Sequence, residues 1–137
     1  MTIPASNGGR GLPISSQRAG FPVSARLLRH SDFERVYKQG RRHFAAHMTV
    51  FFLRRQQGQG LDEGLRVGFT VGRVLGGAVQ RNRMKRRLRE AVRQHRQQAA
   101  VPADVVINPK KSVLTAEFSV LSQEVQRAFA VIQQKLG

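Results

Sequence analysis

The chain contains no cysteine and no tryptophan, and only 8 of its 137 residues are acidic. Without cysteine, it can form neither disulfide bonds nor thiolate-bound metal sites. No segment approaches the roughly 18 consecutive apolar residues of a membrane-spanning helix, and the first 22 residues contain no apolar run typical of a secretory signal. We therefore expect a cytoplasmic protein that is not associated with a membrane.

Positive charge, by contrast, is abundant. The 24 lysine and arginine residues give a formal net charge of +16, which exceeds what solubility requires and indicates a partner that is either nucleic acid or an anionic membrane surface. The length suits one domain with a modest core. We expect a flexible N-terminal tail over residues 1–22, which are rich in Gly, Ser and Pro, followed by a single RNA-binding domain over residues 23–137.

The densest charge lies between Ala78 and Arg96, where the pattern predicts a helix. An apolar stripe at helical spacing is formed by Met84, Leu88, Ala91, Val92 and His95. Like charges four residues apart destabilise a helix by a few tenths of a kcal/mol per pair, so folding does not explain the basic residues and a polyanion does. Eight basic residues stand against the single acid Glu90: Arg81, Arg83, Lys85, Arg86, Arg87, Arg89, Arg93 and Arg96.

A short helix is predicted upstream. Ser31 and Glu34 have the spacing of a capping box with Ser31 as N-cap, and Gly40 is a natural stop. Phe33 and Tyr37 share one face of this helix. Both a core role and a functional role stay open for them, because a two-turn helix cannot bury both rings deeply.

The remaining pattern predicts an α+β sandwich. Alternating and β-branched residues indicate extended chain over residues 41–55, a hairpin loop at the Gly-rich residues 56–64, a strand over residues 66–73, and a short buried strand over residues 104–108. The order is α-β-β-β-α-β-α with a small central sheet. The last helix is predicted to begin near Thr115 or Ala116, with an apolar stripe of Phe118, Leu121, Val125, Ala128, Phe129, Ile132 and Leu136.

Catalytic chemistry is not evident in the chain. Hydrolysis of RNA by a protein requires paired carboxylates that hold a metal, or a histidine acid–base pair. Asp62 and Glu63 are adjacent but sit in a Gly-rich loop without a third ligand. His43 and His47 fall in an extended segment, about 13 Å apart at strand spacing, which is too far for one metal ion. We expect no catalytic residue, no metal site and no cofactor held by the protein.

The string AVQRNRMKRRLREA from Ala78 to Ala91 resembles the A-V-x-R-N-R-x-K-R signature of the bacterial ribonuclease P protein subunit. The likeness extends to RVGFTV at residues 66–71 and SDFERVYKQG at residues 31–40, and it takes in roughly residues 26–136. The resemblance implies the same element order, with the basic helix in a left-handed crossover between parallel strands. It also implies the non-catalytic protein component of an RNA-based endoribonuclease that removes 5′ leaders from precursor tRNA.

The resemblance further implies the partners and two surfaces. The partners are the catalytic RNA, which carries the Mg²⁺-dependent hydrolysis, and precursor tRNA, with no obligate protein partner. Guanidinium groups suit phosphate, and aromatic rings stack on unpaired bases with about 1–3 kcal/mol each, which favours the functional role of Phe33 and Tyr37. The implied contacts with the catalytic RNA are Arg73, Arg81, Asn82, Arg83, Lys85, Arg86 and Arg89; the implied leader cleft comprises Phe33, Tyr37, Phe51 and Thr70.

The chain departs from the family pattern at three glycine or valine positions. Gly72 and Val74 stand where Ser and Lys are common, and Gly77 stands where Asn is frequent. The alternatives are a general RNA- or DNA-binding module such as a ribosomal protein, a stand-alone nuclease, and a membrane-surface helix, for which the apolar stripe is too thin. An aromatic surface would favour the ribonuclease P protein over a general nucleic-acid-binding module, because a protein that binds only the phosphate backbone does not need aromatic rings on its surface.

Overall fold

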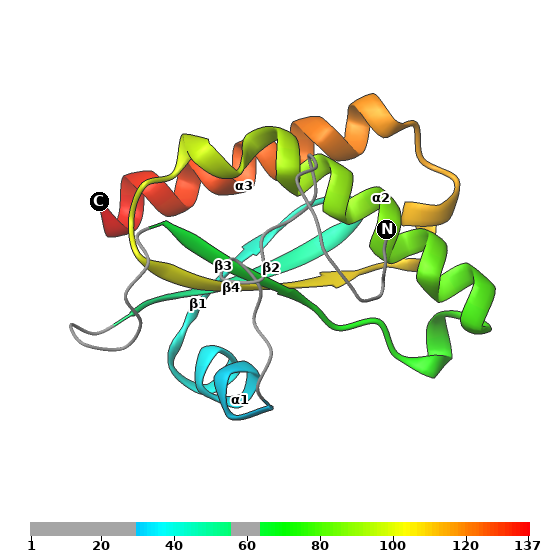
Figure 1. The fold of residues 1–137 in the computed structure, drawn as a ribbon, viewed down its shortest axis with the longest axis horizontal. Coiled ribbons are helices and arrows are strands. Elements are labelled where there is room, and N and C mark those ends of the chain that lie inside the picture. Colours follow the sequence, from blue (N-terminus) through cyan, green and yellow to red (C-terminus); the bar gives the residue numbers. More distant parts are fainter. Residues whose placement is uncertain (1–29, 56–63) are drawn as a thin grey trace, which may run out of the picture.

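The computed structural model describes residues 30–55 and 64–137, so the expectations for the tail at residues 1–22 and for loop residues 56–63 fall outside it. Three short 3-10 helices, η2 (Arg73–Leu75), η3 (Arg96–Gln98) and η4 (Lys111–Leu114), join the main elements. The predicted order and the α+β class are confirmed (Figure 1). The main elements are α1 (His30–Gln39), β1 (Arg41–Phe44), β2 (Met48–Arg54), β3 (Leu65–Phe69), α2 (Ala78–His95), β4 (Ala103–Pro109) and α3 (Phe118–Leu136).

The four described strands form one mixed sheet in the order β1-β2-β4-β3. β1 pairs antiparallel with β2, β2 pairs antiparallel with β4, and β3 pairs parallel with β4. The connection between the two parallel strands contains α2. The predicted crossover through the basic helix is thus confirmed, and its left-handed sense stays a prediction.

The predicted hairpin between the second and third strands is wrong, because β4 lies between β2 and β3. Strand β4 is apolar on both faces, since Val105 and Ile107 belong to one core cluster and Val106 to the other. A strand with apolar side chains on both faces buries the most apolar surface when it lies in the centre of the sheet and is covered on both sides. The hairpin was predicted because β2 and β3 are neighbours in sequence. In the structure, β4 is buried between them and pairs with both.

The helices cover both faces of the sheet, with α2 and α3 on one face and α1 on the other (Figure 1). The alternation of side chains along β2 matches this arrangement. Met48, Val50 and Phe52 belong to the large core together with Met84 and Leu88 of α2 and residues of α3, as predicted for both helices. The smaller core beneath α1 consists of Val36 and Val106, packed against Phe33, Tyr37, Phe51 and Leu53.

Two boundaries near α1 and β1 differ from expectation. Ser31 is the second residue of α1 and not its N-cap, because the helix already includes His30, whose Nε2 lies 3.2 Å from a carboxylate oxygen of Glu34. The predicted extended segment over residues 41–55 consists of two strands, separated at residues 45–47. The Ala45 N–H donates to the Met48 carbonyl at 2.9 Å across this turn, which contains no glycine or proline to signal it.

Two further boundaries are shifted at later elements. β3 ends at Phe69 and not at residue 73, although the Thr70 N–H still donates to the Ile107 carbonyl at 3.0 Å. α3 begins at Phe118, later than Thr115 or Ala116, and Glu117 is its N-cap. Thr115 and Ala116 instead belong to the turn that follows η4, and their N–H groups donate to the Ser112 carbonyl at 3.1 and 2.9 Å.

Gly40 joins α1 to β1 where the backbone of α1 passes close to β2. Its N–H donates to the Val36 carbonyl at 2.9 Å, which closes the last turn of α1. A Cβ atom at Gly40 would lie 2.5 Å from the Val36 oxygen and 2.7 Å from the Phe52 oxygen. Both obstacles are backbone atoms, so only glycine fits without a shift of α1 from the sheet.

We predict that Gly40→Ala lowers the free energy of unfolding by about 1–3 kcal/mol, the usual cost of forcing an extra methyl group into a packed site. Gly72→Ala is the matched control, because a Cβ atom there meets nothing within 4 Å. Urea unfolding followed by circular dichroism measures both variants. Equal stability of the two would contradict the close approach described for Gly40.

Candidate nucleic-acid interface

The basic helix α2 is held against the sheet by its apolar stripe. Met84, Leu88, Ala91 and Val92 are buried, as predicted, whereas His95 is half-buried and its Nε2 lies 2.6 Å from the Ser122 hydroxyl of α3. These contacts fix which side of α2 faces outward. The basic side chains on the other faces of α2 therefore point away from the core.

The start of α2 depends on a glycine pair and one glutamine. Gly76 has φ of 139°, which a residue with a side chain rarely adopts, and the Gly77 N–H donates to Gln80 Oε1 at 2.7 Å. Gly77 has no side chain to cap the helix in return, so only half of a capping box is formed. In the described residues, the first turn of α2 contains no acid, so the positive end of the helix dipole remains uncompensated there.

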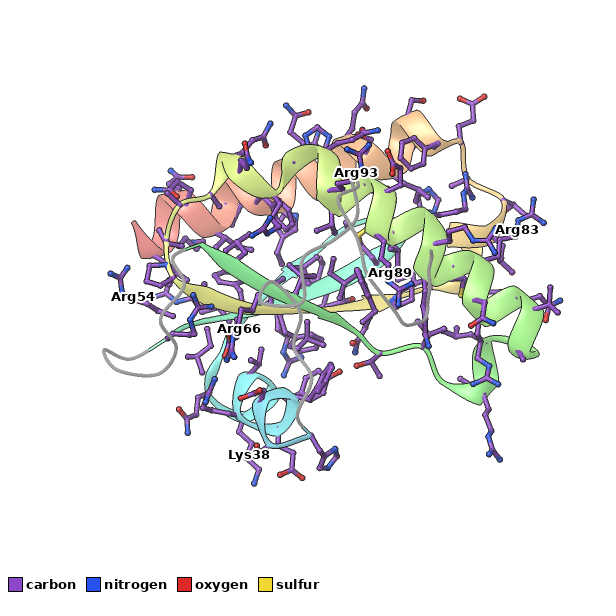
Figure 2. The ribbon with its side chains drawn as sticks, in the orientation of Figure 1. Lys38, Arg54, Arg66, Arg83, Arg89 and Arg93 are labelled. Carbon is purple, nitrogen blue, oxygen red and sulfur yellow. The ribbon has the colours of Figure 1, made fainter. Side chains whose placement is uncertain are left out.

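The predicted contacts with RNA extend from η2 to the second half of α2. Arg73 lies in η2, immediately before the helix, and is exposed. Figure 2 shows Arg83, Arg89 and Arg93 spaced along α2, with Arg66 on the other side of the sheet beside α1. The predicted α2 residues divide into exposed Asn82, Arg83, Arg86 and Arg89 and half-buried Arg81 and Lys85.

Two other arginines of α2 have partners within the protein. Arg87 donates to the carbonyls of Val113 and Ala116 and so anchors the segment before α3. Arg93 pairs with Glu90, and the hydrogen bond from Arg93 lowers the pKa of that carboxyl group. Exposed Arg73, Arg83 and Arg86 thus place positive charge near the start of α2, whereas Glu90 offsets the charge of Arg93 near its end.

A second candidate surface lies between α1 and the sheet. It consists of three aromatic side chains and one threonine, which together we call the aromatic cluster: Phe33, Tyr37, Phe51 and Thr70. The rings of Tyr37 and Phe51 meet edge to face, with centroids 4.8 Å apart and planes at 88°. Phe33 packs into the same small core. The three aromatic side chains are half-buried and Thr70 is exposed. Each ring therefore packs partly in the small core and lies partly at the surface. The structure thus brings together all four residues of the predicted leader site.

Hydrogen bonds hold Tyr37 in place within the aromatic cluster. Its hydroxyl donates to Asn108 Oδ1 at 2.9 Å and lies 2.7 Å from Thr70 Oγ1. Asn108 was not predicted as a site residue. Its signal in the sequence was a second polar side chain, besides Asp104, in the buried strand DVVIN, on the face opposite Val105 and Ile107.

The other flank of α1 is attached to the sheet through a buried carboxylate. Asp104 of β4 is 0% exposed. It accepts from Arg66 Nε and Nη2 at 2.8 and 3.0 Å, from Arg55 Nη1 at 3.2 Å, and from Arg35 of α1. Asp32 adds longer ion pairs to Arg35 at 3.6 Å and to Arg66 at 3.8 Å. We call these five residues the Asp104 cage.

The Asp104 cage is a closed group of opposite charges. Three guanidinium groups surround two carboxylates, which leaves one net positive charge. Carboxylate oxygens engaged in this way do not form a metal site. Among residues 30–55 and 64–137, no group of three or more His, Asp or Glu side chains could hold a metal ion.

His43 lies in β1 and His47 lies in the turn before β2, so the expected spacing along one strand is wrong. His47 Nδ1 lies 2.7 Å from the Ser112 hydroxyl, and its Nε2 lies 3.7 Å from Glu124 of α3. Burial lowers the pKa of His43, and nearby Arg127 lowers it further. These contacts join the turn to α3 and have no link to either candidate surface.

The remaining surface features lie apart from the predicted residues. A shallow pocket of about 500 Å³ opens on the outer side of α3, lined by Gln123, Gln126, Arg127 and Ala130. None of the predicted site residues lines it. Neither α2 nor α3, the two longest helices in the described part of the chain, is apolar enough to cross a membrane.

Comparison with known proteins relates this arrangement to one family. The Ribonuclease P family model matches residues 21–133. The chain is 36% identical to the ribonuclease P protein component of Geobacter sp. (strain M21) over 117 residues, which cover 85% of this chain and 96% of the relative. The chain belongs to the ribonuclease P family. The match in the described residues includes α1, the whole sheet, α2 and most of α3, and therefore both candidate surfaces.

Solved structures of ribonuclease P proteins share the fold. The Thermotoga maritima protein is 26% identical and superposes with a TM-score of 0.64 over 76% of this chain and 94% of its own. The Staphylococcus aureus protein, at 22% identity, supports the fold alone, with a TM-score of 0.65 over 82% of this chain and 98% of its own. The mixed four-stranded sheet with helices on both faces is thus the fold of the ribonuclease P proteins.

We predict that Asp104→Asn lowers the free energy of unfolding by about 3 kcal/mol or more, because it removes the central charge of a buried ion-pair cluster. Glu90→Gln is the matched control: it also removes one negative charge, but from the exposed pair with Arg93, and we expect little change. Chemical denaturation at fixed ionic strength compares the two. Similar losses would show that overall charge, and not the Asp104 cage, sets the stability.

Proposed function

We propose that this chain is the protein subunit of ribonuclease P, which binds the catalytic RNA and the 5′ leader of precursor tRNA and so promotes removal of the leader. The observation that carries the proposal is the presence of two different surfaces in one small fold. One is the basic surface from Arg73 to Arg89, and the other is the aromatic cluster at α1. A module that recognises only the RNA backbone has no use for the second surface.

The basic surface is suited to the structured RNA partner. Exposed guanidinium groups match the geometry of phosphate oxygens, and the counterions released on binding supply affinity without sequence preference. The uncompensated N-terminus of α2 adds a favourable potential for phosphate. Gly72 and Val74 provide no side-chain donor beside Arg73, so we propose that α2 itself supplies most of the contacts with the catalytic RNA.

The aromatic cluster is suited to an unpaired strand. Bases stack on aromatic rings irrespective of their identity, which fits a subunit that meets leaders of many sequences. The hydrogen bonds of Tyr37 to Thr70 and Asn108 fix the ring before the RNA arrives, so little freedom is lost on binding. The cluster lies on the face of the sheet opposite α2 and α3 (Figure 1).

We assign the hydrolysis to the RNA and its Mg²⁺ ions, which supply the metal-activated nucleophile. The side chains of this chain bind and orient the substrate. The support for this division is that Asp104, the most buried acid of the described residues, is surrounded by guanidinium groups, which fit no metal. We propose that the holoenzyme acts in the cytoplasm, where precursor tRNA is made.

Reconstitution with the catalytic RNA tests the proposal. We expect the protein to increase 5′ cleavage of precursor tRNA at low Mg²⁺ and to show no cleavage by itself. Phe51→Ala should weaken binding of precursor tRNA to the holoenzyme by about fivefold or more, the lower end for loss of one stacking ring. Binding of mature tRNA, which has no leader, should be unchanged.

Three results would count against separate parts of this proposal. Unaltered cleavage on addition of the protein would reject the subunit role. Cleavage by the protein alone would reject the assignment of chemistry to the RNA. An equal loss of precursor and mature tRNA binding in Phe51→Ala would reject the assignment of the aromatic cluster to the leader while leaving the subunit role intact.

The contacts of α2 can be counted through their salt dependence. Each lost phosphate contact should reduce the slope of log K against log salt for catalytic RNA binding by about 1. We therefore expect a smaller slope for Arg83→Ala and for Lys85→Ala. Arg93→Ala serves as the control, since Arg93 is paired with Glu90, and should alter the slope less. Equal slopes in all variants would mean that these side chains contact no phosphate.

A further inference from the structure

Phe44, at the end of the edge strand β1, is an aromatic side chain that the core does not use. It is 70% exposed, the most exposed aromatic ring among the large hydrophobic side chains on the described surface. A ring of this size in contact with water is unfavourable, by about 25 cal/mol for each Å² of apolar surface. The ring does not stabilise the fold, so a binding role has to be considered.

The register of the sheet determines which face carries Phe44. Phe44 lies opposite Thr49, and Arg42 lies opposite Phe51, in the antiparallel pair of β1 and β2. Opposite residues in such a pair point to the same face. Phe51 belongs to the small core on the α1 side, so Arg42 and Phe44 also point to that side. His43, between them, faces α3, where Arg127 and Glu124 influence its pKa.

The aromatic cluster therefore continues outward across β1. Phe44 and Phe51 are diagonal neighbours, a relation that places residues about 7–8 Å apart and within reach of aromatic side chains. The guanidinium group of Arg42 lies over the Phe51 ring, with Cζ 5.6 Å from the centroid. Arg42 is exposed and forms no ion pair with an acid of the described residues.

We propose that Arg42 and Phe44 form a second leader subsite, which takes the next unpaired nucleotide of the same strand as it passes from Phe51 to the edge of the sheet. Phe44 would stack on the base and Arg42 would contact the phosphate between the two stacked bases. This inference rests on the proposed function of the aromatic cluster. It adds a site that neither the sequence pattern nor the family resemblance assigned.

The chemistry of the surface favours single-stranded RNA over another protein segment. Arg41 and Arg42 are both exposed on the short edge strand, and no acid belongs to β1, so the surface is complementary to a polyanion. A base stacks on one ring face with little preference for sequence, and the guanidinium group supplies the phosphate contact that a peptide would not require. The subsite is also continuous with the aromatic cluster, where the same strand is proposed to bind.

Leader length separates the two subsites. The reconstituted holoenzyme is titrated with precursor tRNAs whose leaders are extended one nucleotide at a time. We expect Phe44→Ala to weaken binding by about fivefold or more for long leaders only. Phe51→Ala should already weaken binding for shorter leaders. Val120→Ala on α3, which removes an exposed apolar side chain elsewhere, is the matched control and should not alter binding at any length.

Two further variants separate stacking from charge. Phe44→Leu keeps the apolar volume but removes the flat ring, and we expect it to behave like Phe44→Ala. Arg42→Gln should reduce the salt dependence of binding for long leaders, whereas Arg42→Lys should retain most of it, because lysine still neutralises one phosphate.

The results of these titrations test the second subsite and the proposed function separately. If Phe51→Ala shows the leader effect and Phe44→Ala shows none, the second subsite is rejected and the aromatic cluster remains the leader site. If Phe44→Ala weakens binding of mature tRNA or of the catalytic RNA to the same extent, the occupant is not the leader and the inference is overturned. If neither variant depends on leader length, the leader assignment itself fails.

Discussion

The ion pairs around the buried carboxylate of Asp104 are the interaction on which the rest of the structure depends. Asp104 lies in the central strand β4 and joins Arg35 of α1 to Arg66 of β3 and to Arg55, which follows β2. Arg55 also donates to the carbonyls of Ala103 and Gly64. A carboxylate without such partners would be too costly to bury. The same contacts therefore fix the sheet, the end of the loop before β3, and the position of α1.

The position of α1 creates the aromatic cluster. Val36 packs on Val106, with the Asp104 cage on one flank of the helix and Tyr37 with Thr70 and Asn108 on the other. The cage holds α1 by charge, whereas the flank with Tyr37 is held by a few neutral hydrogen bonds and remains partly exposed. The Asp104 cage thus attaches α1 on one side, and the other side presents the aromatic rings partly exposed.

The two faces of the sheet separate the two surfaces to which we assign RNA recognition. On one face, α2 and α3 enclose the large core, and the outer side of α2 carries the charge between Arg73 and Arg89. On the other face, the rings of Tyr37 and Phe51 offer a small surface with a fixed orientation. Electrostatic attraction acts over about a Debye length and tolerates variation in position, whereas stacking requires contact. The proposed function uses this separation, because it assigns the structured RNA to the charged surface and the short unpaired strand to the aromatic cluster.

The sequence by itself determined the element order, the buried stripe of α2, the core stripe of α3 and the family, because helical periodicity and the R-N-R string are local patterns. It also placed Phe33, Tyr37, Phe51 and Thr70 in one site through the family resemblance. Only the tertiary structure decided that β4 is central, that Asp104 is caged by three arginines, and that Asn108, Arg42 and Phe44 border the aromatic cluster. The reason is that strand order and register join residues far apart in sequence. Burial on both faces of β4 sets that order, and no local pattern records it.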